Sequence, residues 1–276
     1  MNATATLDHA AGALRRAGVD TPQVDAEWLL AHALGVSRSE LPAQGARELS
    51  AAEERSFLSC LDRRARREPL AYVLGEWGFR RLTLSLDPRA LVPRPETETV
   101  VERCLALLAE APKPRVLDVG VGSGAIALAI ADEHPFAQVV GVDSSEAALA
   151  LAEGNRARTG VDGRVRLVHG DLLRGVEGRF DLVVSNPPYV GAEEWERLQP
   201  EIRLYEPRAA LVGTGVGEVI ACDAQGLLVE GGVLVLEAGD GQAAHLAAAL
   251  DDLGYDGVAI TPDLAGRDRV VEGRRP

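Results

Sequence analysis

The chain has 276 residues, of which 46% are hydrophobic and 26% charged, and its net charge is −13. This length suffices for one large domain or two modest ones, and the composition is that of an ordinary globular protein. The three cysteines lack a C-x-x-C spacing and the five histidines are scattered. This pattern argues against a disulfide framework or a metal site, and it favours a reducing compartment, the cytoplasm.

No segment approaches the roughly 18 consecutive apolar residues of a membrane helix, so we expect no membrane partner. The charge is unevenly distributed, because residues 1–75 are nearly balanced and the remainder carries almost all of the negative excess. A protein that binds duplex DNA needs a basic face to displace counterions from the phosphates. We therefore expect no direct binding to duplex DNA.

The first 75 residues predict a small all-helical domain. Thr21 followed by Pro22 is typical of an N-cap with proline at the first helical position. Ser50 and Glu53 fit a capping box at the start of a later helix.

Residues 76–95 predict a connector between two domains. Apolar and polar residues partly alternate from 76 to 92, as in a short hairpin. The prolines at 93 and 95 favour an extended backbone before a helix that begins near Glu96.

From residue 115 onward, short apolar strands alternate with helices. Strands are expected at 116–119, 139–142, 165–168, 181–184 and 233–236, and helices at 123–133, 145–158 and 215–229. This alternation predicts a mostly parallel sheet with helices on both faces. Sheets of this kind bind ligands beyond the carboxyl ends of their strands.

A glycine-rich loop follows the first of these strands and consists of Asp118, Val119, Gly120, Val121, Gly122, Ser123 and Gly124. Glycines allow a sharp turn and let a ligand approach the backbone. Asp143, at the next strand end, is placed to accept both ribose hydroxyls of a nucleoside, and Asp171 to reach an adenine edge from the third strand. Three alternatives follow from the loop alone: a dinucleotide, S-adenosylmethionine, or a tight turn with no ligand.

The fourth strand is followed by the tetrapeptide Asn186-Pro187-Pro188-Tyr189. A dehydrogenase has no use for it, and together with the acids at three strand ends it favours S-adenosylmethionine over a dinucleotide. An amide nitrogen is a poor nucleophile because its lone pair is delocalised. Two acceptors, the Asn186 side-chain oxygen and the Pro187 carbonyl, would hold an NH2 group in line with a sulfonium methyl.

The two prolines make this turn rigid, so that both acceptors are fixed in advance. Tyr189 offers a flat face for a planar target group. The candidate catalytic residues are therefore Asn186, Pro187 and Tyr189, with no metal required. The competing interpretation is a proline-rich turn after a buried strand.

The chain resembles the release-factor glutamine methyltransferases of the HemK/PrmC type over nearly its whole length. The resemblance rests on segments 68–76 (Glu-Pro-Leu-Ala-Tyr-Val-Leu-Gly-Glu), 91–98 (Leu-Val-Pro-Arg-Pro-Glu-Thr-Glu), 118–124, 185–189, 205–208 (Tyr-Glu-Pro-Arg) and 263–270 (Asp-Leu-Ala-Gly-Arg-Asp-Arg-Val). Asn-Pro-Pro-Tyr alone is shared with DNA adenine methyltransferases, but its combination with Pro-Arg-Pro-Glu-Thr-Glu is highly specific.

The resemblance implies a class I methyltransferase: a Rossmann-like α/β fold with a mostly parallel seven-stranded sheet. A helical substrate-recognition domain at 1–75 and a linker at 76–95 would precede a methyltransferase domain at 96–276. The expected reaction is methylation of the glutamine amide in the Gly-Gly-Gln motif of peptide-chain release factors, which yields S-adenosylhomocysteine.

The family pattern also implies site residues. Gly120 to Gly124, Asp143 and Asn186 would bind S-adenosylmethionine, and Asn186, Pro187, Pro188 and Tyr189 would hold the substrate glutamine. Some members carry an aromatic residue where this chain has Leu172, which can still pack on adenine by apolar contact.

Several alternatives remain open from the sequence. The substrate could be a ribosomal protein, or the chain could be a DNA adenine methyltransferase or a non-catalytic binding module. The arginines of 63–67 are either a solvated helix end or a contact to an acidic release-factor surface. Pro93 to Glu98 either line the cofactor pocket or form a stiff connector. Trp195 and Arg208, in the long loop 190–214, either shape the substrate entrance or anchor the loop.

Overall fold

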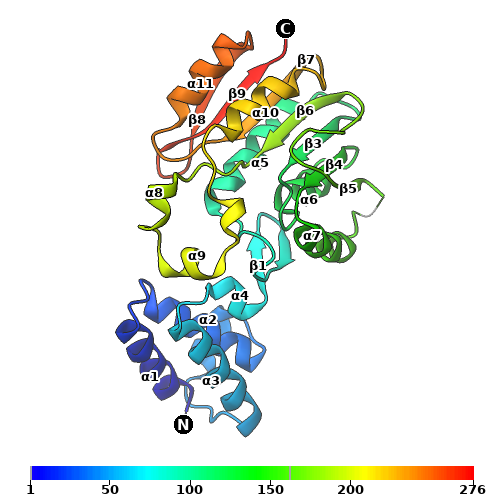
Figure 1. Ribbon diagram of the computed structural model, residues 1–276. Coiled ribbons are helices and arrows are strands. Elements are labelled where there is room, and N and C mark those ends of the chain that lie inside the picture. The colour runs from blue at the N-terminus through cyan, green and yellow to red at the C-terminus, as the bar shows by residue number, and fades with distance from the viewer. Residues whose placement is uncertain (1, 162) are drawn as a thin grey trace. The chain divides into compact units, whose positions relative to one another are not determined.

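The computed structural model describes residues 2–161 and 163–276 (Figure 1). Contacts divide the chain into two compact units. The helical unit comprises the residues up to Glu76 together with Gln199–Tyr205, and the catalytic unit comprises Trp77–Leu198 with Glu206–Pro276. The sequence analysis assigned 199–205 to the methyltransferase domain, but the contacts of this segment group it with the helical unit.

The helical unit is built from α1 (Ala3–Arg16), α2 (Pro22–Leu34), η1 (Arg38–Gln44), α3 (Ala51–Ala65), α4 (Leu70–Leu74) and, from the distant segment, α9 (Pro200–Tyr205). Its core includes Leu14, Leu29 and Phe57, all almost fully buried. The predicted capping box at Ser50 and Glu53 is confirmed, because each side chain accepts a hydrogen bond from the other residue's backbone N–H.

The N-terminus of α2 lies where the sequence placed it, with Pro22 in the first turn. Thr21 occupies the N-cap position, but its side chain does not form the expected capping hydrogen bond. Its hydroxyl donates to Asp25 Oδ1 at 2.8 Å and does not accept from the helix backbone. Asp25 is buried, and this hydrogen bond satisfies one of its oxygens.

The partial alternation correctly predicted a two-stranded hairpin, β1 (Glu76–Phe79) and β2 (Leu82–Ser85). The predicted connector 76–95 is not a separate segment, because its residues from Trp77 onward group with the catalytic unit. Phe79 and Leu84 point into the core and are nearly inaccessible to solvent. Helix α5 (Pro95–Leu108) then starts with Pro95 at its first position, within one residue of the predicted start.

A seven-stranded sheet forms the centre of the catalytic unit, in the order β5-β4-β3-β6-β7-β9-β8. Its strands are β3 (Arg115–Val119), β4 (Gln138–Asp143), β5 (Val165–His169), β6 (Phe180–Ser185), β7 (Leu228–Glu237), β8 (Asp256–Pro262) and β9 (Asp268–Arg274). The first five are parallel, and β9 is antiparallel to both β7 and β8. The predicted fold class is confirmed, although the local patterns singled out neither β8, a largely exposed edge strand, nor β9.

Helices cover both faces of this sheet (Figure 1). On one face lie α5, α6 (Ala125–Glu133) and α7 (Glu146–Thr159), and on the other α10 (Val216–Ala224) and α11 (Ala243–Asp252). Successive residues of a strand point to opposite faces. Val116 therefore packs toward α6, and Leu117 toward α10. Two short elements, α8 (Ala192–Trp195) and η2 (Arg208–Ala210), lie in the loop after β6.

Two predicted elements differ in length. The helix predicted at 215–229 ends at Ala224, and the strand predicted at 233–236 begins already at Leu228. Leu228 continues the pairing of β7 with Phe180 of β6, across a register shift. This long-range pairing, which a local pattern does not contain, extends the strand toward the helix.

Candidate active site

The glycine loop and the tetrapeptide leave the sheet side by side. Strand β3 is paired with β6, and Val119 lies opposite Ser185 at the carboxyl ends. The Ser185 hydroxyl donates to the Val119 carbonyl at 2.7 Å and ties the two strand ends together. Both predicted motifs therefore meet at the edge where sheets of this type bind ligands.

The glycines of the loop have two different functions. Gly120 has φ +77°, and a β-carbon there would meet nothing within 4 Å. Its backbone is thus left open for a ligand while it takes a conformation that few other residues adopt. At Gly124, a β-carbon would lie 2.8 Å from Leu128 Cδ1, so this glycine lets α6 begin close to the loop.

Asp143 braces the loop from the end of β4. Its Oδ2 accepts from the Gly122 N–H at 2.8 Å, and its Oδ1 from the Ser145 N–H at 2.9 Å. The side chain is half-buried. Each carboxylate oxygen has two lone pairs, so both retain capacity for a further donor, such as a ribose hydroxyl.

Asp118 is buried beneath the loop, with 1% of its surface exposed. Its Oδ2 accepts from the Ala127 N–H at 3.0 Å, whereas its Oδ1 is buried and has no hydrogen-bond partner. Burial, with a contribution from the charge of Asp143, raises the pKa of Asp118 to about 7. Asp118 therefore holds the start of α6 and keeps one acceptor unused.

Asp171 and Leu172 follow β5 at the same edge of the sheet. Asp171 is exposed and forms an ion pair with Arg174 at 2.9 Å. Leu172 has φ +51°, and it packs against the apolar cluster that includes Leu173. The predicted adenine contacts thus lie on a turn that is more solvent-exposed than the glycine loop.

The side chain of Asn186 is held by a residue of α5. Asn186 Nδ2 donates to Thr97 Oγ1 at 3.3 Å, and Thr97 Oγ1 donates in turn to Glu237 Oε2 at 2.7 Å. With the amide nitrogen so engaged, Asn186 Oδ1 is left as a hydrogen-bond acceptor. Thr97 lies in α5, Asn186 in the loop after β6 and Glu237 at the end of β7.

The Tyr189 hydroxyl also donates a hydrogen bond to Glu237, on Oε1 at 3.4 Å. Glu237 is 1% exposed, and its burial raises its pKa to about 7. Burial likewise raises the pKa of Tyr189, aided by the nearby charge of Glu237. Tyr189 is therefore a neutral hydrogen-bond donor at physiological pH and not a general base.

A cavity of about 350 Å³ adjoins the tetrapeptide. Its walls include Pro187, Pro188 and Tyr189, the N-terminus of α10, and Gln242 beside α11. Gln242 Nε2 donates to the Tyr189 carbonyl at 3.0 Å and fixes the end of the turn. A larger cavity, of about 720 Å³, lies at the start of β4 and β5, at the opposite end of the strands, and contains none of the predicted site residues.

The sequence analysis did not name Glu237 or Gln242 as site residues, and it considered Thr97 only as part of the segment Pro93 to Glu98. A signal for Glu237 was present, because it directly follows a run of apolar strand residues, as Asp143 does. The motif at 91–98 contains Thr97 but does not indicate its partner, and no local pattern marks Gln242, since their contacts lie 89 and 53 residues away along the chain.

The structure shows contacts of Pro93 to Glu98 that neither interpretation of this segment included. Arg94 forms an ion pair with Glu206 at 2.6 Å, Glu96 with Arg267 at 2.7 Å, and Thr97 contacts Asn186. The segment is therefore more than a connector, because it braces the tetrapeptide from the α5 side. In the loop 190–214, the guanidinium of Arg208 lies over the ring of Trp195 at 5.8 Å, as expected for residues that anchor the loop.

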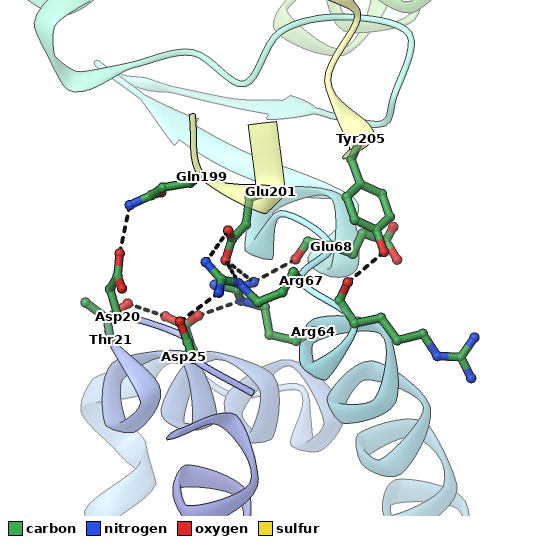
Figure 2. Close-up of polar contacts among 11 residues, drawn as sticks. Asp20, Thr21, Asp25, Arg64, Arg67, Glu68, Gln199, Glu201 and Tyr205 are labelled. Atoms are coloured by element: carbon green, nitrogen blue, oxygen red, sulfur yellow. Dashed lines mark hydrogen bonds and ion pairs between the residues drawn. The ribbon is translucent and has the colours of Figure 1, made fainter. Parts of the chain in front are cut away.

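The basic run 63–67 is largely internal to the helical unit. Arg64 is 5% exposed and binds Asp25 at 2.6 Å and Glu201 at 2.8 Å, and Arg67 binds the other oxygen of Glu201 at 2.6 Å (Figure 2). Neither arginine is a solvated helix end, and neither is available to an external acidic surface. Arg66 is well exposed, whereas Arg63 is partly exposed and binds Glu68 and the carbonyls of Tyr72 and Val73.

Over residues 2–161 and 163–276, no group of three or more His, Cys, Asp or Glu side chains is arranged to hold a metal ion. Within the same ranges, no helix has the length and apolar character needed to cross a membrane.

The architecture of the catalytic unit is that of class I methyltransferases. A methyltransferase from Pyrococcus furiosus has a similar structure, with a TM-score of 0.51 at 22% identity over 70% of this chain and 88% of that one. The 16S rRNA N2 G1207 methyltransferase of T. Thermophilus, solved in complex with AdoMet and guanosine, gives a TM-score of 0.53 at 19% identity, over 73% of this chain and 50% of that one. At these identities the likeness establishes the fold alone.

Sequence comparison defines the family. The family models for the PrmC N-terminal domain and the methyltransferase small domain match residues 5–75 and 101–215. The release factor glutamine methyltransferase of Deinococcus radiodurans is 43% identical over 98% of this chain and 97% of its own length, and that of Caulobacter vibrioides is 40% identical over 94% and 92%. The chain belongs to the release factor glutamine methyltransferase family, as the sequence motifs predicted.

Proposed function

We propose that this protein transfers a methyl group from S-adenosylmethionine to the side-chain amide nitrogen of the glutamine in the Gly-Gly-Gln motif of peptide-chain release factors. The observation that supports this most directly is the position of Asn186. Its Oδ1 is left as an acceptor at the carboxyl end of β6, next to the glycine loop at the end of β3. Relatives at about 40% identity over nearly the full length are named release factor glutamine methyltransferases, which supports the proposed type of substrate.

The residues at the end of β3 suit S-adenosylmethionine. The open backbone at Gly120 and Gly122 accommodates a ligand that packs closely on the chain. Asp143 has spare lone pairs for ribose hydroxyls, and Asp118 Oδ1 is a buried acceptor suited to the ammonium group at the amino-acid end. Asp171 and Leu172 are assigned to the adenine. Val121 and Ser123 belong to the same loop and are assigned to the cofactor with it. S-adenosylmethionine supplies a sulfonium methyl group that is already activated for transfer.

The tetrapeptide provides the chemistry that a glutamine amide requires. Two acceptors, Asn186 Oδ1 and the Pro187 carbonyl, take the two N–H groups of the substrate amide and orient its nitrogen. Orientation of this kind contributes several kcal/mol to lowering a barrier. Pro187 and Pro188 fix the turn, and Tyr189 is held by Glu237 and Gln242 so that its ring is available for stacking.

The proposed partner follows from this chemistry. Peptide-chain release factors work on ribosomes, so we place the reaction in the cytoplasm. No contact with duplex DNA is part of the proposal, because the excess of acidic residues opposes phosphate binding.

The deciding experiment uses labelled S-adenosylmethionine with a purified release factor and with its Gly-Gly-Gln variant in which Gln is replaced by Ala. We expect label in the first and none in the second. Ribosomal proteins from the same source serve as a parallel substrate. Equal labelling of the two release-factor forms, or label confined to a ribosomal protein, would overturn the substrate assignment.

A further inference from the structure

We infer that Glu237 and Thr97 form a positioning relay that fixes which way the Asn186 amide faces, an inference that rests on the proposed function. The relay is the chain of hydrogen bonds Glu237–Thr97–Asn186 described above. The residue in contact with substrate is Asn186, whereas Glu237 and Thr97 act through it.

The direction of the relay follows from what each group can donate. An ionised carboxylate only accepts, so the single hydroxyl proton of Thr97 must point to Glu237 Oε2. The lone pairs of Thr97 Oγ1 then require a donor, and Asn186 Nδ2 is that donor. The amide is thereby held with Oδ1 on the side away from Thr97. The reversed amide would place two acceptors against each other.

Two members of the relay are shielded from water, and the other oxygen of Glu237 accepts from the Tyr189 hydroxyl. Thr97 is 4% exposed and Glu237 is 1% exposed. Among the described residues, no cationic side chain forms an ion pair with Glu237. Arg269, whose charge lowers the pKa of Glu237, donates a hydrogen bond to the Ala238 carbonyl instead. A buried polar group without a partner is costly, so each member of the relay depends on the next one.

Protonation of Glu237 would reverse the relay. A neutral carboxyl can donate to Thr97, the Thr97 hydroxyl can then donate to Asn186 Oδ1, and the amide NH2 would face the substrate NH2. Two hydrogen-bond donors, the Asn186 NH2 and the substrate NH2, would then face each other, and the substrate amide would no longer have Asn186 Oδ1 as an acceptor. Burial raises the pKa of Glu237 to about 7, so this change falls near physiological pH.

The charged and titratable groups around Glu237 come from several elements. They are Glu96 on α5, Arg269 on β9 and Tyr189 after β6, with Glu218 of α10 and His245 of α11 lining the same cavity. Asp118, beneath the glycine loop, also has a raised pKa of about 7, and it can add to a pH effect on activity. A variant of Glu237 is therefore needed to assign any effect to the relay.

The first test compares two substitutions of Thr97 in the full-length protein. Thr97→Val keeps the shape and removes the hydroxyl, and Thr97→Ser keeps the hydroxyl. We expect Thr97→Val to lower kcat about 10- to 100-fold, with KM for the release factor and Kd for S-adenosylhomocysteine within about threefold of wild type. Thr97→Ser should retain kcat within about threefold. A role in packing alone would affect the two variants in the opposite order, because serine leaves the larger gap.

The second test is the pH profile of kcat for wild type and Glu237→Gln. Wild-type kcat should rise about tenfold from pH 6 to pH 8, and this rise should be lost or strongly reduced in Glu237→Gln. Unchanged kcat in Thr97→Val, or the same rise in both proteins, would overturn the relay while the proposed function stands. A wild-type enzyme that fails to label the release factor would overturn the proposed function itself.

Discussion

Two buried glutamates, one in each unit, are stabilised in opposite ways. Glu201, 9% exposed in the helical unit, accepts from Arg64 and Arg67 (Figure 2). Glu237, 1% exposed in the catalytic unit, accepts from two neutral hydroxyls, those of Thr97 and Tyr189. Burial favours the neutral form of both side chains, but only Glu201 forms ion pairs with arginines that oppose this effect.

The pKa values express this difference. Burial raises the pKa of Glu201, but the hydrogen bonds from Arg67 and Arg64 outweigh it, and the net pKa lies below the ordinary value. For Glu237 burial dominates, and the pKa is about 7. Glu201 thus keeps a permanent charge that joins a distant segment to the helices, whereas Glu237 can gain or lose its proton near neutrality.

The largest expected effect comes from breaking the charged cluster at its centre. Arg64→Met would leave Asp25 and Glu201 buried with less compensation, and removing one partner of a buried ion pair costs about 3–5 kcal/mol. Denaturant unfolding of the variant should show this loss. Arg66→Met is the matched control, because Arg66 is exposed and its surface ion pair with Asp62 contributes about 0–1 kcal/mol. Equal stability of the two variants would contradict the proposed role of Arg64.

The next largest effect is on activity and not on folding. Asn186→Ala removes one of the two acceptors for the substrate amide, and we expect kcat to fall about 10²- to 10³-fold with little change in the unfolding midpoint. Tyr189→Phe is the control, since it removes only the long hydrogen bond to Glu237 and keeps the ring. Turnover of Asn186→Ala at the wild-type rate would refute the acceptor assignment.

Glu201 and Glu237 should differ most clearly in how each affects the pH dependence of the free energy of unfolding. Above the ordinary carboxyl pKa, Glu201 stabilises the fold, and this contribution disappears as the pH falls through its lowered pKa. Glu237 has the opposite sign. Between about pH 4.5 and 7 the unfolded chain releases its proton while the folded chain keeps it, so stability falls as the pH rises.

The measurement is the free energy of unfolding of wild type and of each Glu→Gln variant from pH 4 to pH 8. The stability of Glu237→Gln relative to wild type should increase with pH, by on the order of 3 kcal/mol over the interval. That of Glu201→Gln should decrease. Parallel curves for the two variants would show that the two sites do not differ in the way described.

The smallest effect is expected at the periphery of the charged cluster. Tyr205→Phe removes the hydrogen bond from the Tyr205 hydroxyl to the Arg66 carbonyl at 2.9 Å, which is solvent-exposed. A net loss of about 0.5–1.5 kcal/mol is expected from chemical denaturation. A loss as large as that of Arg64→Met would mean that the stability of this segment does not depend chiefly on the buried charges.

Local patterns in the sequence determined most of the architecture. Apolar runs of strand length, the hairpin alternation and the Ser50–Glu53 capping box all depend on residues that are close together in the chain. The glycine loop and the tetrapeptide were recognisable for the same reason. Each is a short contiguous segment whose chemistry is visible in its residue types.

The tertiary structure decided which residues from distant parts of the chain contact one another. Hydrogen bonds between Thr97 and Glu237, 140 residues apart, and between Arg64 and Glu201, 137 residues apart, leave no periodic trace in the sequence. The same holds for the grouping of Gln199–Tyr205 with the helical unit and for the orphaned oxygen of Asp118. A buried carboxylate's partners determine whether it stays charged, and partners distant in sequence are brought together only by the folded chain.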